Sequence, residues 1–181
     1  MGTEDVYRRL GEHLSALGMG YPMRDDLVDI LKENFTPEEA EVALAVPNTV
    51  IPLQAVGVDE INRAIDLPRD KLEKILEALA SKGLLYTGVT EDGEPGYALH
   101  QVGFGFPQTF FWKGEDTPHA RKMAGMLAKY FNRKVTREAF SPSETKPYRY
   151  IPVGRTLEAD LQAVYPYHMM KTVIDQAEVI A

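Results

Sequence analysis

The segment 58–99 constrains the fold of this chain most, because a single glycine separates a helical pattern from an alternating one. The helical pattern places apolar side chains at three- and four-residue spacing, namely Leu72, Ile75, Leu76 and Leu79. Gly83 follows at the point where a helix commonly ends on a left-handed residue. Residues 84–87 and 96–99 then alternate as short strands around a turn at 91–94. The segment therefore predicts a helix that leads directly into a two-stranded hairpin.

The residues before this helix extend the pattern to a complete small fold. Residues 58–65 predict a short helix, and the tight turn 66–68 joins it to the longer helix 69–82. Upstream, Thr36 and Pro37 start a helix that stops at Pro47, and a short β-branched segment follows at 49–53. Helix, turn, helix and hairpin is the order of a winged helix-turn-helix. We expect this fold over residues 35–99, inside a mainly α chain of the α+β class with flanking N- and C-terminal helices.

The flanking regions predict further helices. Residues 1–34 contain two helical patterns, at 3–17 and 24–34, that we expect to pack on the winged helix. Residues 100–181 read in order as an aromatic segment, a basic helix at 117–133, a turn-rich stretch at 140–147, a strand at 148–153 and a last helix from 166. We expect 1–34, 35–99 and 100–181 to form one compact unit.

Charge is divided unevenly along the chain, whose net charge is −7. Residues 1–116 carry 10 basic and 21 acidic side chains, whereas residues 117–149 carry 8 basic and 2 acidic ones. One basic region in an acidic chain suggests an electrostatic contact surface. No apolar run is long enough to cross a bilayer, and the N-terminus lacks the apolar core of a signal peptide. We therefore expect a cytoplasmic protein with no membrane partner.

The residues that usually carry chemistry are missing or scattered. The chain has no cysteine, so it has no thiolate that could hold an iron–sulfur cluster or zinc. The four histidines are far apart and without metal-binding spacing: His13, His100, His119 and His168. The serines lie outside nucleophile motifs, and the paired carboxylates lie at helix starts, where the helix dipole explains them. We expect a chain that is not an enzyme, with no catalytic, cofactor-binding or metal residue of its own.

Several phrases of the sequence together resemble one family. They are residues 35–40 (FTPEEA), 76–85 (LEALASKGLL), 97–104 (YALHQVGF), 149–153 (RYIPV), 165–167 (YPY) and 175–181 (DQAEVIA). This order resembles the N-terminal region of winged-helix 4Fe–4S ferredoxin-type proteins of anaerobic bacteria and archaea. In that family the last helix leads into a cysteine-rich region that binds two clusters.

The resemblance implies a docking module of an electron-transfer protein, with its 4Fe–4S clusters beyond residue 181. A natural paralogue that lacks the electron-carrying half is the alternative. The partner would then be another protein or the chain's own C-terminal cluster domain.

A DNA-binding transcriptional regulator is the alternative function, because a winged helix often places its second helix in the major groove. Candidate contacts to DNA or to a protein partner are Arg69, Lys71, Lys74 and Lys82 on that helix, and Arg121, Lys122, Lys129 and Arg133 in the basic region. However, charges on residues 69–82 nearly cancel, and Glu91, Asp92 and Glu94 at the hairpin tip would repel phosphates. The sequence therefore favours a protein partner over nucleic acid.

Aromatic side chains gather just after the hairpin: Phe104, Phe106, Phe110, Phe111 and Trp112. Two interpretations remain open for this cluster. The rings either pack against the first helices or form the interface of a homodimer.

Overall fold

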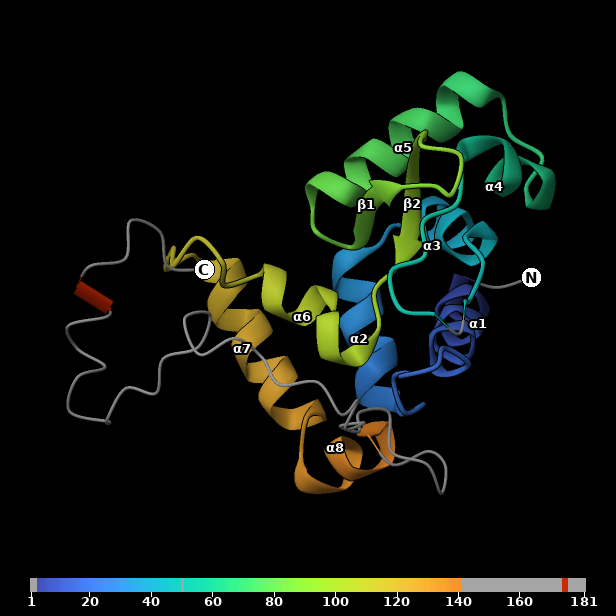
Figure 1. Ribbon diagram of the computed structural model, residues 1–181. Helices are drawn as coiled ribbons and strands as arrows, with labels where there is room; N and C mark the ends of the chain where they lie inside the picture. Colours follow the sequence, from blue (N-terminus) through green and yellow to red (C-terminus); the bar gives the residue numbers. More distant parts are fainter. Residues whose placement is uncertain (1–2, 50, 141–173, 176–181) are drawn as a thin grey trace, which may run out of the picture. The chain divides into compact units, whose positions relative to one another are not determined.

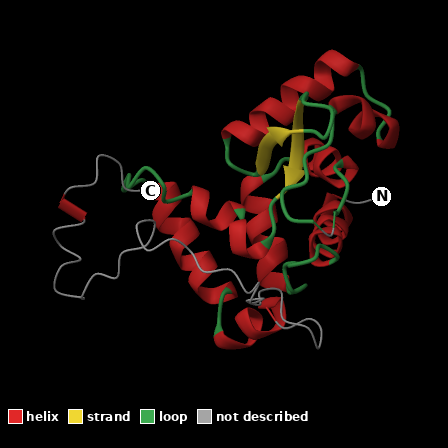
Figure 2. Cartoon of the chain, in the orientation of Figure 1, coloured by secondary structure: helices red, strands yellow, loops and turns green. Residues whose placement is uncertain are grey.

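The structure is a computed structural model that describes residues 3–49, 51–140 and 174–175. Its chain divides into two compact units, 1–147 and 148–181. The described residues are mainly helical and include a small two-stranded antiparallel sheet (Figure 2), which confirms the expected mainly α, α+β class. In the second unit only residues 174–175 are described, and both are helical.

Three helices form the N-terminal part of the first unit: α1 (Thr3–Ser15), α2 (Asp25–Asn34) and α3 (Pro37–Ala45). Helix α1 contacts both α2 and α3 (Figure 1), and these contacts bury Leu10 and Leu27 completely. The predicted start of α3 is confirmed by a reciprocal cap. Glu39 N donates to Thr36 Oγ1 at 3.2 Å, and Thr36 N donates to Glu39 Oε2 at 2.9 Å.

The elements predicted over residues 58–99 are confirmed in kind and order. They are α4 (Val58–Ala64), α5 (Arg69–Ser81), β1 (Leu85–Val89) and β2 (Pro95–Leu99). Helix α5 ends because Gly83 adopts a φ of +70°, which lets the Leu84 amide donate to the Leu79 carbonyl at 2.9 Å. The two strands pair antiparallel with Leu85 opposite Leu99. Helices α3, α4 and α5 contact one another (Figure 1), so this region shares one core.

The β-branched segment 49–53 contains no strand among its described residues. Pro52 lacks an amide proton, Leu53 has a φ of +60°, and Ile51 is 62% exposed, so the segment turns instead of pairing. The strand-like contact comes later, at Val56. Its N and O both bond to Tyr97 at 2.9 Å, which adds a single bridging residue beside β2.

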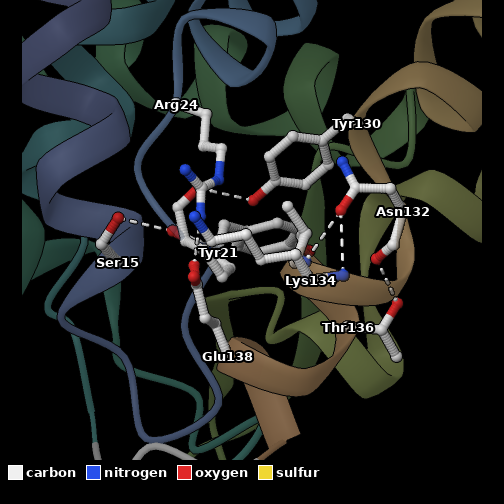
Figure 3. A network of polar contacts seen from close by, with 10 residues as sticks. Ser15, Tyr21, Arg24, Tyr130, Asn132, Lys134, Thr136 and Glu138 are labelled. Atoms are coloured by element: carbon white, nitrogen blue, oxygen red, sulfur yellow. Dashed lines mark hydrogen bonds and ion pairs between the residues drawn. The ribbon is translucent and has the colours of Figure 1, made fainter.

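After the hairpin come a 3₁₀ turn (Val102–Phe104), α6 (Phe106–Thr109), α7 (Pro118–Tyr130) and α8 (Arg133–Phe140). The sequence predicts one helix to about residue 133 and none directly after it, whereas the structure has a break and a second helix. Helix α7 ends at Tyr130, and Asn132 then caps a new helix: its Oδ1 accepts from the amides of Lys134 at 3.0 Å and Val135 at 3.1 Å (Figure 3). Residues 133–140 are therefore helical.

Polar contacts tie α7 and α8 to the loop before α2 (Figure 3). Tyr130 Oη donates to the Pro22 carbonyl at 2.8 Å, and Arg24 forms an ion pair with Glu138 at 2.5 Å. Burial raises the pKa of Tyr130, so this hydroxyl remains a donor at any physiological pH. The predicted turn at 141–147, strand at 148–153 and start of the last helix lie outside the described residues.

Candidate functional site

A groove of about 840 Å³ lies between the residues before α4, the first turns of α4 and α5, and the hairpin tip. Six carboxylates line it: Asp59, Glu60, Glu73, Glu91, Asp92 and Glu94. We call these six residues and the space between them the acidic groove. Two guanidinium groups, those of Arg63 and Arg69, share the lining, so its fixed charge is strongly negative.

Local backbone geometry places these carboxylates. Asp59 and Glu60 occupy the first turn of α4, where the helix dipole stabilises negative charge. At the hairpin tip, Thr90 N donates to the Glu94 carbonyl at 2.8 Å, and Gly93 has a φ of +86°. This turn leaves Glu91 and Asp92 exposed at its centre.

Arg69 is held inside the groove rather than presented to a ligand. Its Nε donates to Glu73 at 2.8 Å, and its Nη1 bonds to Asp59. The hydrogen bonds that Arg69 donates to Glu73 and Asp59 raise the pKa of Arg69, which stays charged. In contrast, no ion pair holds Glu60, Glu91 or Glu94 within the described part of the chain. The groove thus keeps uncompensated carboxylates around a fixed internal ion pair.

The other predicted contacts on α5 are also largely engaged. Lys71 pairs with Glu38, and Lys82 donates to Glu39 at 2.6 Å. Partial burial acts to raise the pKa of Glu39, but the hydrogen bonds from Lys82 and Thr36 and the charge of Lys82 together outweigh it, so the pKa is lowered. Of the four predicted α5 cations, Lys74 alone has no partner among the described residues. Helix α5 therefore offers no free basic face.

The predicted basic region mostly bridges helices. Lys122 donates to Glu33 at 2.6 Å, and Lys129 pairs with Asp26, so both link α7 to the acidic helix α2. Arg121 makes two hydrogen bonds of 2.5 Å with Asp116. These pairs are exposed, so water screens each of them strongly, yet together they explain why basic residues concentrate here.

Helix α8 also carries exposed cations without an ion-pair partner in the described part of the chain. Arg133, from the predicted set, is exposed and has no ion-pair partner among the residues that the structure describes. Lys134 and Arg137 share this property. The sequence prediction left both out of the contact set, although the i, i+3 spacing of Lys134 and Arg137 within a helix would have grouped them.

The aromatic cluster divides into a core part and a surface part. Phe106 is buried and stacks on Tyr21 with ring centroids 5.2 Å apart, which confirms packing beside the first helices for this residue. Phe110 is half-buried against Phe106. Phe111 and Trp112 are exposed, by 42% and 74%. The side chain of Phe104 lies outside the described set, and the homodimer interface stays a prediction.

Within residues 3–49, 51–140 and 174–175, no group of three or more His, Cys, Asp or Glu side chains is arranged to hold a metal ion. No helix in the same residues is both long and apolar enough to span a membrane. No protein-family model, curated protein or solved structure matches this chain. The groove, the ion pairs and the exposed aromatic residues are therefore the features that bear on function.

Proposed function

We propose that residues 35–99 form a winged helix that works as a non-catalytic protein-docking module, and that its acidic groove receives a Lys- or Arg-rich segment of the partner. The observation that carries this proposal is the excess of six carboxylates over two guanidinium groups in the groove lining. Complementary charge steers a basic partner into such a groove and disfavours an acidic one.

The arrangement of elements supports the winged-helix assignment. Helices α3, α4 and α5 contact one another, α5 leads into the β1–β2 hairpin, and Val56 pairs with Tyr97 in the position of a third short strand. DNA-binding winged helices use their second helix and the hairpin. Here the first turn of α5 and the hairpin tip border the acidic groove, so DNA docked in that way would bring its phosphates toward Glu91 and Asp92.

We further propose, on the resemblance carried by segments such as 35–40 and 76–85, that this module serves an iron–sulfur electron-transfer protein. The partner would be a basic surface of a redox protein or of a cluster domain on the same polypeptide. The nucleotide sequence that follows the codon for Ala181 tests the single-polypeptide form. Codons after Ala181 that encode a CxxCxxC set within a few dozen residues are expected, and their absence contradicts the single-polypeptide form.

A DNA-binding regulator is the second candidate, and it is favoured by Lys74 together with the α8 cations that lack an ion-pair partner among the described residues. Fluorescence anisotropy distinguishes the two functions, with a labelled random-sequence duplex and a labelled Lys/Arg-rich peptide as probes at low salt. We expect residues 1–181 to bind the peptide, with an affinity that falls as salt rises, and not to bind the duplex. Duplex binding by the unmodified chain contradicts the docking proposal.

A charge reversal in the acidic groove tests whether the Lys/Arg-rich peptide binds there. The double variant Glu91→Lys/Asp92→Lys should weaken peptide binding roughly tenfold or more, because two attractive charges become repulsive. Its matched control is Glu12→Lys/Asp29→Lys, which makes the same change at exposed positions outside the groove. Equal losses in both variants would show a dependence on net charge alone, contrary to the proposal.

A further inference from the structure

The turn between α6 and α7 (Figure 1) carries the chain's single tryptophan on its surface. Gly114 N donates to the Phe111 carbonyl at 3.0 Å, which closes the turn and leaves Trp112 near its tip. Gly114 has a φ of +64°, a conformation that favours glycine. Tryptophan is usually well buried, so an indole this exposed is a candidate contact residue.

A shallow hollow of about 300 Å³ lies beside this turn. Phe111, Gly114, Ala120 and Ala124 form the apolar part of its lining, and Glu115, Asp116 and Arg121 form the charged part. We call the four residues of the apolar part together with Trp112 the Trp112 surface. The surface combines a protruding aromatic side chain with an apolar depression, which is the shape that a self-complementary contact requires.

The charges around the Trp112 surface also suit a self-complementary contact. The exposed residues next to it are Lys113, Glu115, Asp116 and Arg121, two of each sign, and Asp116 pairs with Arg121. A two-fold axis brings a patch against its own copy, so a rim of one sign would repel itself. This rim is neutral, whereas residues 1–116 as a whole are strongly acidic. A second copy therefore meets no net repulsion here.

We propose that a second copy of this chain covers the Trp112 surface in a two-fold symmetric dimer, with each Trp112 seated in the partner's hollow. Buried tryptophans in pockets commonly dominate the energy of an interface. The proposal is independent of the docking function, because its residues lie at 111–124 and those of the acidic groove at 49–95.

Light scattering after size exclusion, over a concentration series of residues 1–181, tests the proposal. We expect a shift from monomer to dimer as concentration rises, with a matching blue shift of the Trp112 emission. Ala124→Arg, which fills the hollow and keeps the fluorophore, should raise the dissociation constant about 30-fold or more, and so should Trp112→Ala. Val89→Ala is the matched control, because Val89 is a 69% exposed apolar residue on β1.

Two results overturn the proposal. The first is a monomer at every concentration up to several hundred micromolar; if its Trp112 emission is then already blue-shifted and shielded from an added quencher, residues of the same chain cover the surface. The second is a dimer that both Ala124→Arg and Trp112→Ala leave unchanged. Far-UV circular dichroism melting shows that each variant is folded, so a lost dimer is a lost contact.

Discussion

At the residue scale, Tyr21 shows how tightly the first unit is packed. Its ring is completely buried and stacks on Phe106, a residue of α6. Gly105 lies directly against the Tyr21 hydroxyl, and a β-carbon at this position would overlap that oxygen and lie 2.8 Å from Pro107 Cδ. The segment around Gly105 therefore packs against the loop after α1 with no space for another atom.

Gly105→Ala should consequently lower the free energy of unfolding by about 1–3 kcal/mol, the usual cost of overpacking a core. Gly125→Ala is the contrasting change. Gly125 lies within α7, and a β-carbon there meets no atom within 4 Å, so the alanine should stabilise the chain by about 1 kcal/mol. Urea unfolding of both variants measures the difference. Equal effects would show that Gly105 is not packed as described.

At the element scale, the interface between α3 and α5 depends on charges that are distant in sequence. Lys82 and Glu39 are 43 residues apart, and Lys71 and Glu38 are 33 apart. The reciprocal cap at Thr36 and the left-handed Gly83 were predictable, because both are local signals within a few residues. The ion pairs were not, since they form only after α5 has packed on α3.

The pKa of Glu39 should be below its ordinary value of 4.5 in the folded chain. A carboxyl whose pKa is lower in the folded state stabilises the fold above the unfolded pKa, and this contribution is lost as pH falls through the folded pKa. Lys82→Met should raise the pKa of Glu39 and reduce the loss of stability on acidification below about pH 4.5. A carboxyl NMR titration measures the first effect.

Lys71→Met is the control for this titration, because Lys71 pairs with Glu38 instead. An unchanged Glu39 pKa in Lys82→Met would contradict the assignment.

The break between α7 and α8 is an element boundary that the sequence did not predict. The apolar positions of α7 run on to Phe131, so the periodicity predicts a helix to about residue 133 and no separate helix after it. The structure ends α7 at Tyr130 because the Asn132 side chain accepts from two amides that would otherwise lack partners. Asparagine is a favoured capping residue, so the signal was present, but a continuous apolar pattern hid it.

At the scale of the first unit, long-range polar contacts join its last helices to its first. Tyr130 and Pro22 are 108 residues apart, and Arg24 and Glu138 are 114 apart. The acidic groove also forms from segments that are distant in sequence. The sequence predicted the acidic hairpin tip, but not its approach to the carboxylates of α4 and α5. Only the folded chain brings α4, α5 and the hairpin tip together around the groove.

Tyr130→Phe should destabilise the chain by about 1 kcal/mol, because it removes the donor to a partly buried carbonyl and keeps the ring. Tyr86→Phe is the control, since the Tyr86 hydroxyl makes no hydrogen bond with any other described residue. Thermal unfolding by calorimetry compares the two. A Tyr130→Phe variant as stable as the control would show that the contact contributes nothing to the attachment of α7.

The proposed function makes the acidic groove, and not a basic helix, the docking surface. Backbone amide NMR during titration of ¹⁵N-labelled residues 1–181 with the unlabelled Lys/Arg-rich peptide tests it most directly. We expect the largest shift changes at 54–60, 69–73 and 90–95, and we expect them to disappear in Glu91→Lys/Asp92→Lys. Shift changes that concentrate on α7 and α8, or that persist in this variant, would contradict it.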